Sequence, residues 1–141
     1  MGVRTLRGLL AVATVCFAFG GCSSSSGGVN ATEKDFSIHL ASSSASSGDV
    51  TFHVKNGGPS PHEFVVFKTD LTEANLPTTK KAGAIIVNET GPGLTHIDEI
   101  SGLNKGDSKD LTVNLMPGKY VVICNLPTHY QLGMHAAFTV K

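Results

Sequence analysis

The sequence predicts an all-β fold, a sandwich of about eight short strands. Residues 36–40 and 50–54 alternate apolar and polar side chains, which is the period of a strand with one buried face. Six further apolar or alternating segments follow, at residues 64–67, 84–87, 95–100, 111–115, 120–124 and 136–140. Turn-forming residues such as Gly91-Pro92-Gly93 and Met116-Pro117-Gly118 separate them. Short strands spaced in this way are typical of a β-sandwich.

Two segments between the expected strands are assigned to loops. The serine-rich residues 41–48 are too few to separate domains, so we expect a long turn between two strands. In residues 71–82 a helix could be capped by Thr69 and Asp70, but Pro77 would interrupt it. We therefore expect a loop there with at most one helical turn.

The first 32 residues are expected to precede a single domain, residues 33–141. Residues 1–21 resemble a secretory signal, because two arginines precede an apolar run that is too short to span a bilayer. Small residues then lead to Cys22, which resembles the lipid-attachment cysteine of bacterial lipoproteins. We expect residues 22–32 to be a lipidated cysteine and a Ser/Gly tether with a reach of about 17 Å. The protein would then be extracytoplasmic, in the periplasm or at the cell surface, and anchored to a membrane.

Charge and cysteine content limit the functions that fit. Once Arg4 and Arg7 leave with the signal, 9 basic and 11 acidic residues remain, a net charge of about −2, so no basic patch suggests nucleic acid. Cys16 lies in the signal and Cys22 is the expected lipid site, which leaves Cys124 as the single thiol of the domain. No disulfide is then available. A lone cysteine in an exported chain is either a reactive thiol or a metal ligand.

Soft metal ligands follow Cys124 in the sequence. In Cys124-Asn-Leu-Pro-Thr-His129-Tyr-Gln-Leu-Gly-Met134 a thiol, an imidazole and a thioether occupy one short loop. Thiolate and thioether favour Cu(I), and imidazole accepts both oxidation states of copper. A fourth ligand is expected at His62, where a strand begins after a Gly- and Pro-rich turn. Two histidines, one cysteine and a weak axial methionine are the ligands of a blue-copper electron-transfer site.

At these residues the sequence resembles the cupredoxin family. The C-x4-H-x4-M spacing of residues 124–134 is similar to that of the rusticyanin and auracyanin branch. Pro61-His62-Glu63-Phe64-Val65-Val66 is similar to the first-histidine strand of bacterial single-domain cupredoxins, the plastocyanin- and azurin-like proteins. The resemblance implies a Greek-key β-sandwich that carries single electrons on one Cu(I)/Cu(II) ion per chain, held by His62, Cys124, His129 and Met134.

One residue departs from the family pattern. Many cupredoxins carry Asn after the first histidine, and this chain has Glu63. A backbone N–H contact from this residue to the cysteine sulfur is still possible. The sequence does not show how side chains brace the ligand loops here.

Other functions would use the same residues. The main alternative is a copper-binding or chaperone lipoprotein for copper homeostasis or oxidase assembly. An enzyme with Cys124 as nucleophile and His129 as base is disfavoured, because the metal would occupy both side chains. Zinc is disfavoured because thioether is unusual among its ligands, and a copper nitrite reductase would need histidines from a second domain. We therefore expect a protein that is not an enzyme.

The expected partners are redox proteins such as a cytochrome or an oxidase, and the protein itself is expected to be a monomer. Electron-transfer interfaces tend to be small. We expect the ring edge of His129 to lie near the surface, within an apolar docking patch formed by Pro61, Pro127, Tyr130 and Leu132.

The four remaining histidines are expected to lie outside the site. His39 and His53 fall at polar positions of alternating strands and should be exposed. His96 is assigned to the surface, with a second, weak metal site as the alternative. His135 should point to the opposite face of its strand from Met134.

Overall fold

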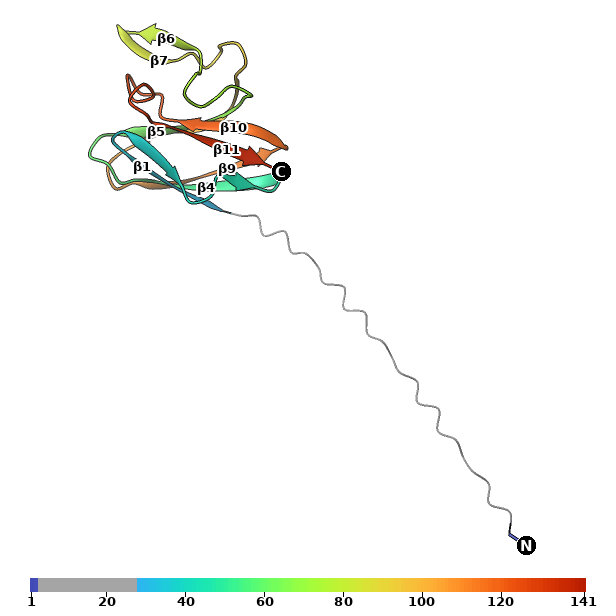
Figure 1. Ribbon diagram of the computed structural model, residues 1–141. Coiled ribbons are helices and arrows are strands. Elements are labelled where there is room, and N and C mark those ends of the chain that lie inside the picture. The colour runs from blue at the N-terminus through green and yellow to red at the C-terminus, as the bar shows by residue number, and fades with distance from the viewer. Residues whose placement is uncertain (3–27) are drawn as a thin grey trace.

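Eleven strands and no helix make up the described part of the chain, residues 1–2 and 28–141 of this computed structural model (Figure 1). Within these residues, accordingly, no helix could cross a membrane. The expected signal and the expected lipidation site Cys22 lie outside the described residues. The strands are β1 Val29–Lys34, β2 Ser37–Leu40, β3 Ser44–Ala45, β4 Gly48–Asn56, β5 His62–Lys68, β6 Thr78–Lys81, β7 Ala84–Val87, β8 Thr95–Leu103, β9 Ser108–Leu115, β10 Gly118–Ile123 and β11 His135–Val140.

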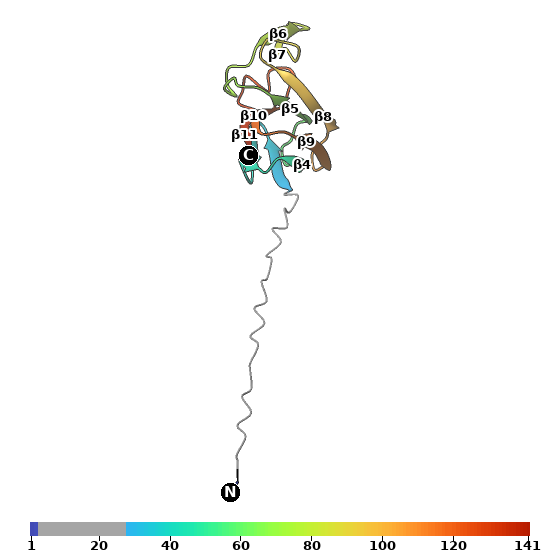
Figure 2. The same cartoon turned by 90° about the vertical axis from the view of Figure 1, so that its right-hand side faces the viewer.

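Two sheets pack face to face, as the sequence predicts. One has the strand order β2-β1-β4-β9 and the other the order β3-β11-β10-β5-β8. The sheet of β4 and β9 is the lower layer in Figure 1, and the hairpin β6-β7 projects above the upper layer. The side view of Figure 2 also places this hairpin at the far end of the molecule from β4 and β9. Neighbours that are distant in sequence, such as β4 with β9 and β5 with β10, are typical of Greek-key sandwiches.

The space between the two sheets is filled by the alternating residues of the predicted strands. In β4 the buried side chains are Val50, Phe52 and Val54, and the residues between them face outward. The Phe52 ring lies 5.3 Å from that of Phe64 and 5.2 Å from that of Phe138. Side chains from both sheets therefore interlock in one core.

Strand β5 is buried on both faces, which explains why residues 64–67 are apolar throughout. A second apolar cluster covers the outer face of β5 and β10, and its buried members are Val65, Phe67, Leu76, Val87, Val121, Ile123 and Tyr130. Leu76 and Val87 come from the segment that includes the β6-β7 hairpin. The hairpin region thus shields this face of the sheet from water.

The domain begins earlier than the sequence predicts. Residues 29–32 are predicted as tether, yet Val29–Lys34 forms β1, which pairs with β2 on one side and β4 on the other. Its buried positions are Val29, Ala31 and Glu33. An ionisable residue at an inward position breaks the apolar alternation, so the pattern does not reveal the strand.

The segment 71–82 contains a strand, and the helical turn considered for it is absent. Thr78–Lys81 is β6, and it pairs with β7 across Ala82 and Gly83, whose φ angles are 50° and 86°. Two consecutive residues with positive φ angles are typical of a two-residue hairpin loop. All four β6 residues are exposed, so no apolar pattern marks the strand. With β1 and the two-residue β3 at Ser44–Ala45, this strand accounts for the difference between eight predicted strands and eleven.

Candidate metal centre

Three neighbouring strands bring the predicted ligands to one end of the sandwich. His62 opens β5, Cys124 follows β10 directly, and Met134 directly precedes β11. Strand β10 runs antiparallel to both β5 and β11. The end of β10 therefore lies beside the starts of its two neighbours, and His129 is carried on the loop between Cys124 and Met134.

Three of the four predicted side chains converge on one point. Cys124 Sγ lies 3.3 Å from His129 Nδ1 and 3.9 Å from His62 Nδ1, and the two Nδ1 atoms lie 3.3 Å apart. Thiolate and imidazole ligands lie about 2.0–2.3 Å from a first-row metal ion, so three of them around one ion are roughly 3.5–4 Å apart. The three donor atoms therefore fit a single ion with little movement.

Met134, the fourth predicted residue, is completely buried and belongs to the same core cluster as Cys124. Backbone hydrogen bonds close the loop around it: Met134 N donates to His129 O at 3.1 Å, and Cys124 N donates to Met134 O at 3.1 Å. Gly133 has a φ of 111°, and a Cβ atom there would lie 3.3 Å from Phe36 O. A glycine is therefore required immediately before Met134.

The sulfur of Cys124 accepts a hydrogen bond from the strand that carries His62. Glu63 N donates to Cys124 Sγ at 3.4 Å, which is the contact that the sequence leaves possible despite the Asn-to-Glu departure. The bracing of the loop comes from Asn125. Its Oδ1 accepts from Val87 N at 2.6 Å, and its Nδ2 donates to Val87 O at 3.0 Å and to Glu89 Oε1 at 2.9 Å.

The role of Asn125 was not predicted from the sequence. The available signal was its place immediately after Cys124, as a buried amide next to an expected ligand. Its partners are mainly the backbone atoms of Val87 in β7, and a backbone partner leaves no mark in the sequence.

Burial sets the protonation of the site residues. It raises the pKa of the Cys124 thiol to about 12, although the Glu63 backbone N–H acts in the opposite direction. A metal must therefore displace a proton from this sulfur. Burial also lowers the pKa values of His62 and His129, so both imidazoles are neutral at neutral pH and can coordinate.

Glu33 is a buried carboxyl group within the core. Its side chain is completely buried, and neither carboxyl oxygen has a hydrogen-bond partner among the described residues. Burial raises its pKa to about 8, and the charge of Glu63 adds to the rise. The group is therefore largely protonated at neutral pH, which avoids an unpaired charge in the core.

Three of the four residues predicted for the docking patch are exposed. Pro61, Pro127 and Leu132 are exposed, but Tyr130 is not. The Tyr130 hydroxyl donates to Glu73 O and accepts from Leu76 N, both at 2.9 Å, so its place in a surface patch was predicted wrongly. A tyrosine ring with two backbone partners for its hydroxyl is stable in the interior.

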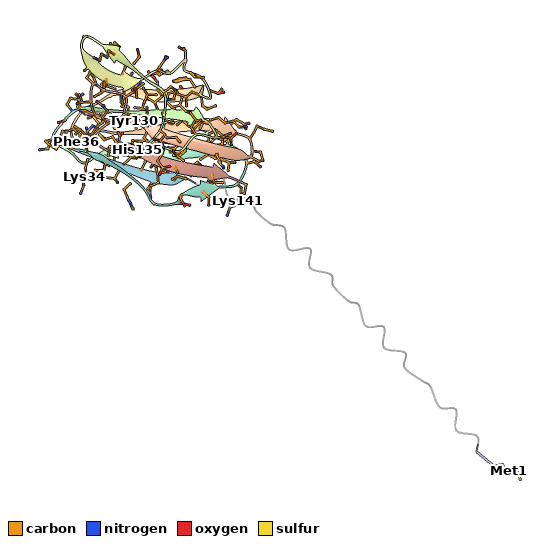
Figure 3. The ribbon with its side chains drawn as sticks, turned by 45° about the horizontal axis from the view of Figure 1, so that its top comes forward. Met1, Lys34, Phe36, Tyr130, His135 and Lys141 are labelled. Atoms are coloured by element: carbon orange, nitrogen blue, oxygen red, sulfur yellow. The ribbon has the colours of Figure 1, made fainter. Side chains whose placement is uncertain are left out.

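Phe36 is the surface residue that the sequence did not assign to this patch. It is 40 % exposed, and its ring meets the half-buried His129 edge-on with the centroids 5.3 Å apart. Its alternation with Ile38 and Leu40 predicted an inward position, but it lies in the turn before β2. Phe36, Tyr130 and His135 lie toward one end of the sandwich and Lys141 toward the other (Figure 3).

The other four histidines stand apart from the three converging donor atoms. His39 and His53 are exposed as predicted, and His53 Nδ1 lies 2.8 Å from Asp110 Oδ1. His96 is also exposed, with its Nε2 3.5 Å from Glu99 Oε2. The ring of His135 lies against that of Tyr130 with the centroids 5.3 Å apart.

A family model covers almost the entire chain. Residues 13–141 match the model described as the sulfocyanin (SoxE) domain. The chain belongs to the sulfocyanin (SoxE) domain family. Sulfocyanins are cupredoxins, so the resemblance that the sequence predicts is confirmed, and copper is the cofactor. No curated protein matches the chain.

Solved structures share the fold of this sulfocyanin domain at low identity. Reduced auracyanin from Roseiflexus castenholzii is 22% identical with a TM-score of 0.55, covering 81% of this chain and 94% of that one. Auracyanin A, a "blue" copper protein from Chloroflexus aurantiacus, is 19% identical with a TM-score of 0.53, covering 82% and 100%. Rusticyanin from Thiobacillus ferrooxidans is 15% identical with a TM-score of 0.51, covering 81% and 77%. These likenesses support the cupredoxin sandwich, whose members are generally electron carriers.

Proposed function

We propose that this sulfocyanin-domain protein carries single electrons on one copper ion bound by His62, Cys124, His129 and Met134. The observation that carries the proposal is the approach of one sulfur and two imidazole nitrogens to within 3.3–3.9 Å of one another at the end of the sandwich. When bound, copper supplies the one-electron Cu(I)/Cu(II) couple. Met134 supplies the weak axial ligand in this proposal, because it lies fully buried beside Cys124 in the core.

The protein around the site favours electron transfer over chemistry on a substrate. His62, Cys124 and Met134 are completely buried, so three of the four proposed ligands have no access to solvent. The loop is closed by its own backbone hydrogen bonds and by Asn125. Ligands that are held in this way move little when the oxidation state changes, which favours fast transfer.

The half-buried His129 is the route by which electrons enter and leave in this proposal. Its ring packs edge-on against the exposed ring of Phe36, and Pro61, Pro127 and Leu132, which the sequence predicts for the same patch, are exposed. A small apolar surface suits brief encounters with a redox partner such as a cytochrome or an oxidase. The ring then lies between the metal and the partner.

We further propose that the chain is exported, lipidated on Cys22 and held at a membrane. The support is the sequence: a basic start, a short apolar run and small residues before a cysteine. Because β1 begins at Val29, only six residues separate the two positions, a tether with a reach of about 13 Å. Replacing Cys22 with Ala should release the protein into the soluble fraction of fractionated cells, and a mass of the native chain without acyl groups would overturn the assignment.

The electron-carrier proposal is tested by titrating the purified chain with Cu(II) and recording its visible spectrum before and after ascorbate. We expect an intense band that saturates at one copper per chain, bleaches on reduction and is lost in Cys124→Ser. His39→Gln, which changes an exposed histidine, is the control and should keep the band. Transfer of the metal to an acceptor protein without electron exchange would favour a copper chaperone instead.

The axial assignment has its own matched pair of variants. Met134→Leu changes a buried methionine and Met116→Leu one that is 63% exposed. We expect the first to keep copper but shift the midpoint potential, and the second to change neither. Complete loss of copper in Met134→Leu would contradict a weak axial role.

A further inference from the structure

A carboxylate lies against the side of the His62 ring that does not face Cys124. Nδ1 of His62 is the nitrogen that approaches Cys124 and His129, whereas Nε2 lies 3.0 Å from Asp35 Oδ1. His62 is completely buried, and the Asp35 side chain is only 18% exposed. The oxygen lies off the N–H axis, so the contact is a close electrostatic pair and not a linear hydrogen bond. Nε2 has no other partner among the described residues.

Two residues of the turn between β4 and β5 hold the Asp35 carboxylate in this place. Ser60 Oγ donates to Asp35 Oδ2 at 2.5 Å, and Ser60 N approaches Asp35 Oδ1 at 3.4 Å. Gly58 makes the approach possible, because a Cβ atom there would lie 2.7 Å from Asp35 Oδ1 and 3.0 Å from His62 Nε2. The hydrogen bond from the Ser60 side chain, as the main cause, lowers the pKa of Asp35, so the group is ionised at neutral pH.

We propose that Asp35 is a positioning residue that orients His62 and lowers the reduction potential of the centre. A carboxylate close to the outer nitrogen of a metal-binding histidine favours the tautomer with the proton on that nitrogen and makes the inner nitrogen a better donor. Its negative charge also favours the state of the site with the higher positive charge. Both effects stabilise Cu(II) relative to Cu(I). The inference rests on the proposed function, since it requires copper on His62 Nδ1.

The test is the midpoint potential of copper-loaded full-length Asp35→Asn, measured by spectroelectrochemistry. We expect the preference for Cu(II) over Cu(I) to fall about tenfold, which raises the potential by about 59 mV. The control is Asp110→Asn, which removes the carboxylate of another histidine pair, His53 and Asp110, at 2.8 Å and on the exposed surface. This control should leave the potential unchanged.

Both Gly58→Ala and Ser60→Ala retain the carboxylate: the first places a Cβ atom against Asp35 and also against His62, and the second removes only the side-chain hydrogen bond to Asp35. Both should raise the potential in the same direction as Asp35→Asn and by less. In metal-free protein, ¹⁵N NMR should show the His62 proton on Nε2 in the wild type and a larger share on Nδ1 in Asp35→Asn. This readout does not depend on copper.

The outcomes separate this inference from the proposed function. If wild type and Asp35→Asn are both blue and have the same potential, Asp35 has no such role, although the electron carrier stands. If the wild type never develops the copper band, the carrier proposal fails first. If Asp35→Asn does not fold, Ser60→Ala decides: a raised potential supports the role and an unchanged one overturns it.

Discussion

The two histidines of the centre occupy opposite environments. His62 is completely buried at the start of β5, with a carboxylate at its outer nitrogen. His129 lies half-buried on a loop, and its neighbour on the outer side is the partly exposed ring of Phe36. In the proposed function, the His62 side of the site holds a fixed charge and the His129 side is the one that meets a partner. The difference teaches that two ligands of the same residue type can have very different surroundings, and if the proposals hold, His62 tunes the potential and His129 exchanges the electrons.

The largest effect is expected when either histidine is removed, because the two side chains differ in their access to solvent. Both His62→Gly and His129→Gly should abolish the visible copper band in the untreated protein. Added imidazole should restore colour in His129→Gly, because the space it leaves opens toward solvent, and not in His62→Gly. Absorption titrations with imidazole measure the recovery. Equal recovery of the copper band in the two variants would show that the two histidine positions do not differ in access.

The next-largest effect is expected from the buried Glu33, which makes the free energy of unfolding depend on pH. The pKa of Glu33 is about 8 in the folded chain against 4.5 as the ordinary value, so between these pH values the unfolded chain releases a proton that the folded chain retains. This group should therefore lower the free energy of unfolding by up to roughly 4–5 kcal/mol as pH rises from 4.5 to 8. Urea unfolding of metal-free Glu33→Gln should lack this fall relative to wild type. Glu99→Gln, at an exposed position, is the control, and equal pH slopes for Glu33→Gln and wild type would contradict the assignment.

A smaller effect on stability and on copper release is expected when the tie of the ligand loop to β7 is removed. Asn125→Ala should cost about 1–3 kcal/mol of unfolding free energy, because it leaves the N–H and C=O of Val87 without their side-chain partner. It should also speed copper release to a chelator, since the loop after Cys124 loses its tie to β7. Asn114→Ala removes an exposed amide bonded to Asp49 and should change both quantities little. Unaltered copper release in Asn125→Ala would mean that the loop is held by its backbone alone.

The smallest effect is expected for Phe36→Ala. The ring is partly exposed, so stability should change by less than about 1 kcal/mol. The rate of electron exchange with a small redox protein should change severalfold, because the surface next to His129 loses its aromatic contact. Stopped-flow traces at several ionic strengths measure the rate. An unchanged rate would place the docking surface elsewhere.

Residues with a side-chain pattern were predictable from the sequence, and those with backbone or charged partners were not. The alternation of apolar and polar residues predicts β4 directly, and the structure confirms it. The C-x4-H-x4-M spacing predicts a shared site, and Cys124 and His129 do lie together with His62. Strand β1 was missed because its inward residue at 33 is glutamate, and β6 because all of its residues are exposed. Residues far apart in sequence, such as Asp35 and His62, become neighbours only when the chain folds, so no local sequence pattern predicts their contact.

The high pKa of the Cys124 thiol also protects the protein before it meets its metal. With a pKa of about 12, the sulfur holds almost no thiolate at neutral pH, and thiolate is the form that peroxides and disulfides attack. The empty chain should therefore resist oxidation and cross-linking to other thiols. Metal-free protein should therefore keep Cys124 as a thiol that remains available to bind copper.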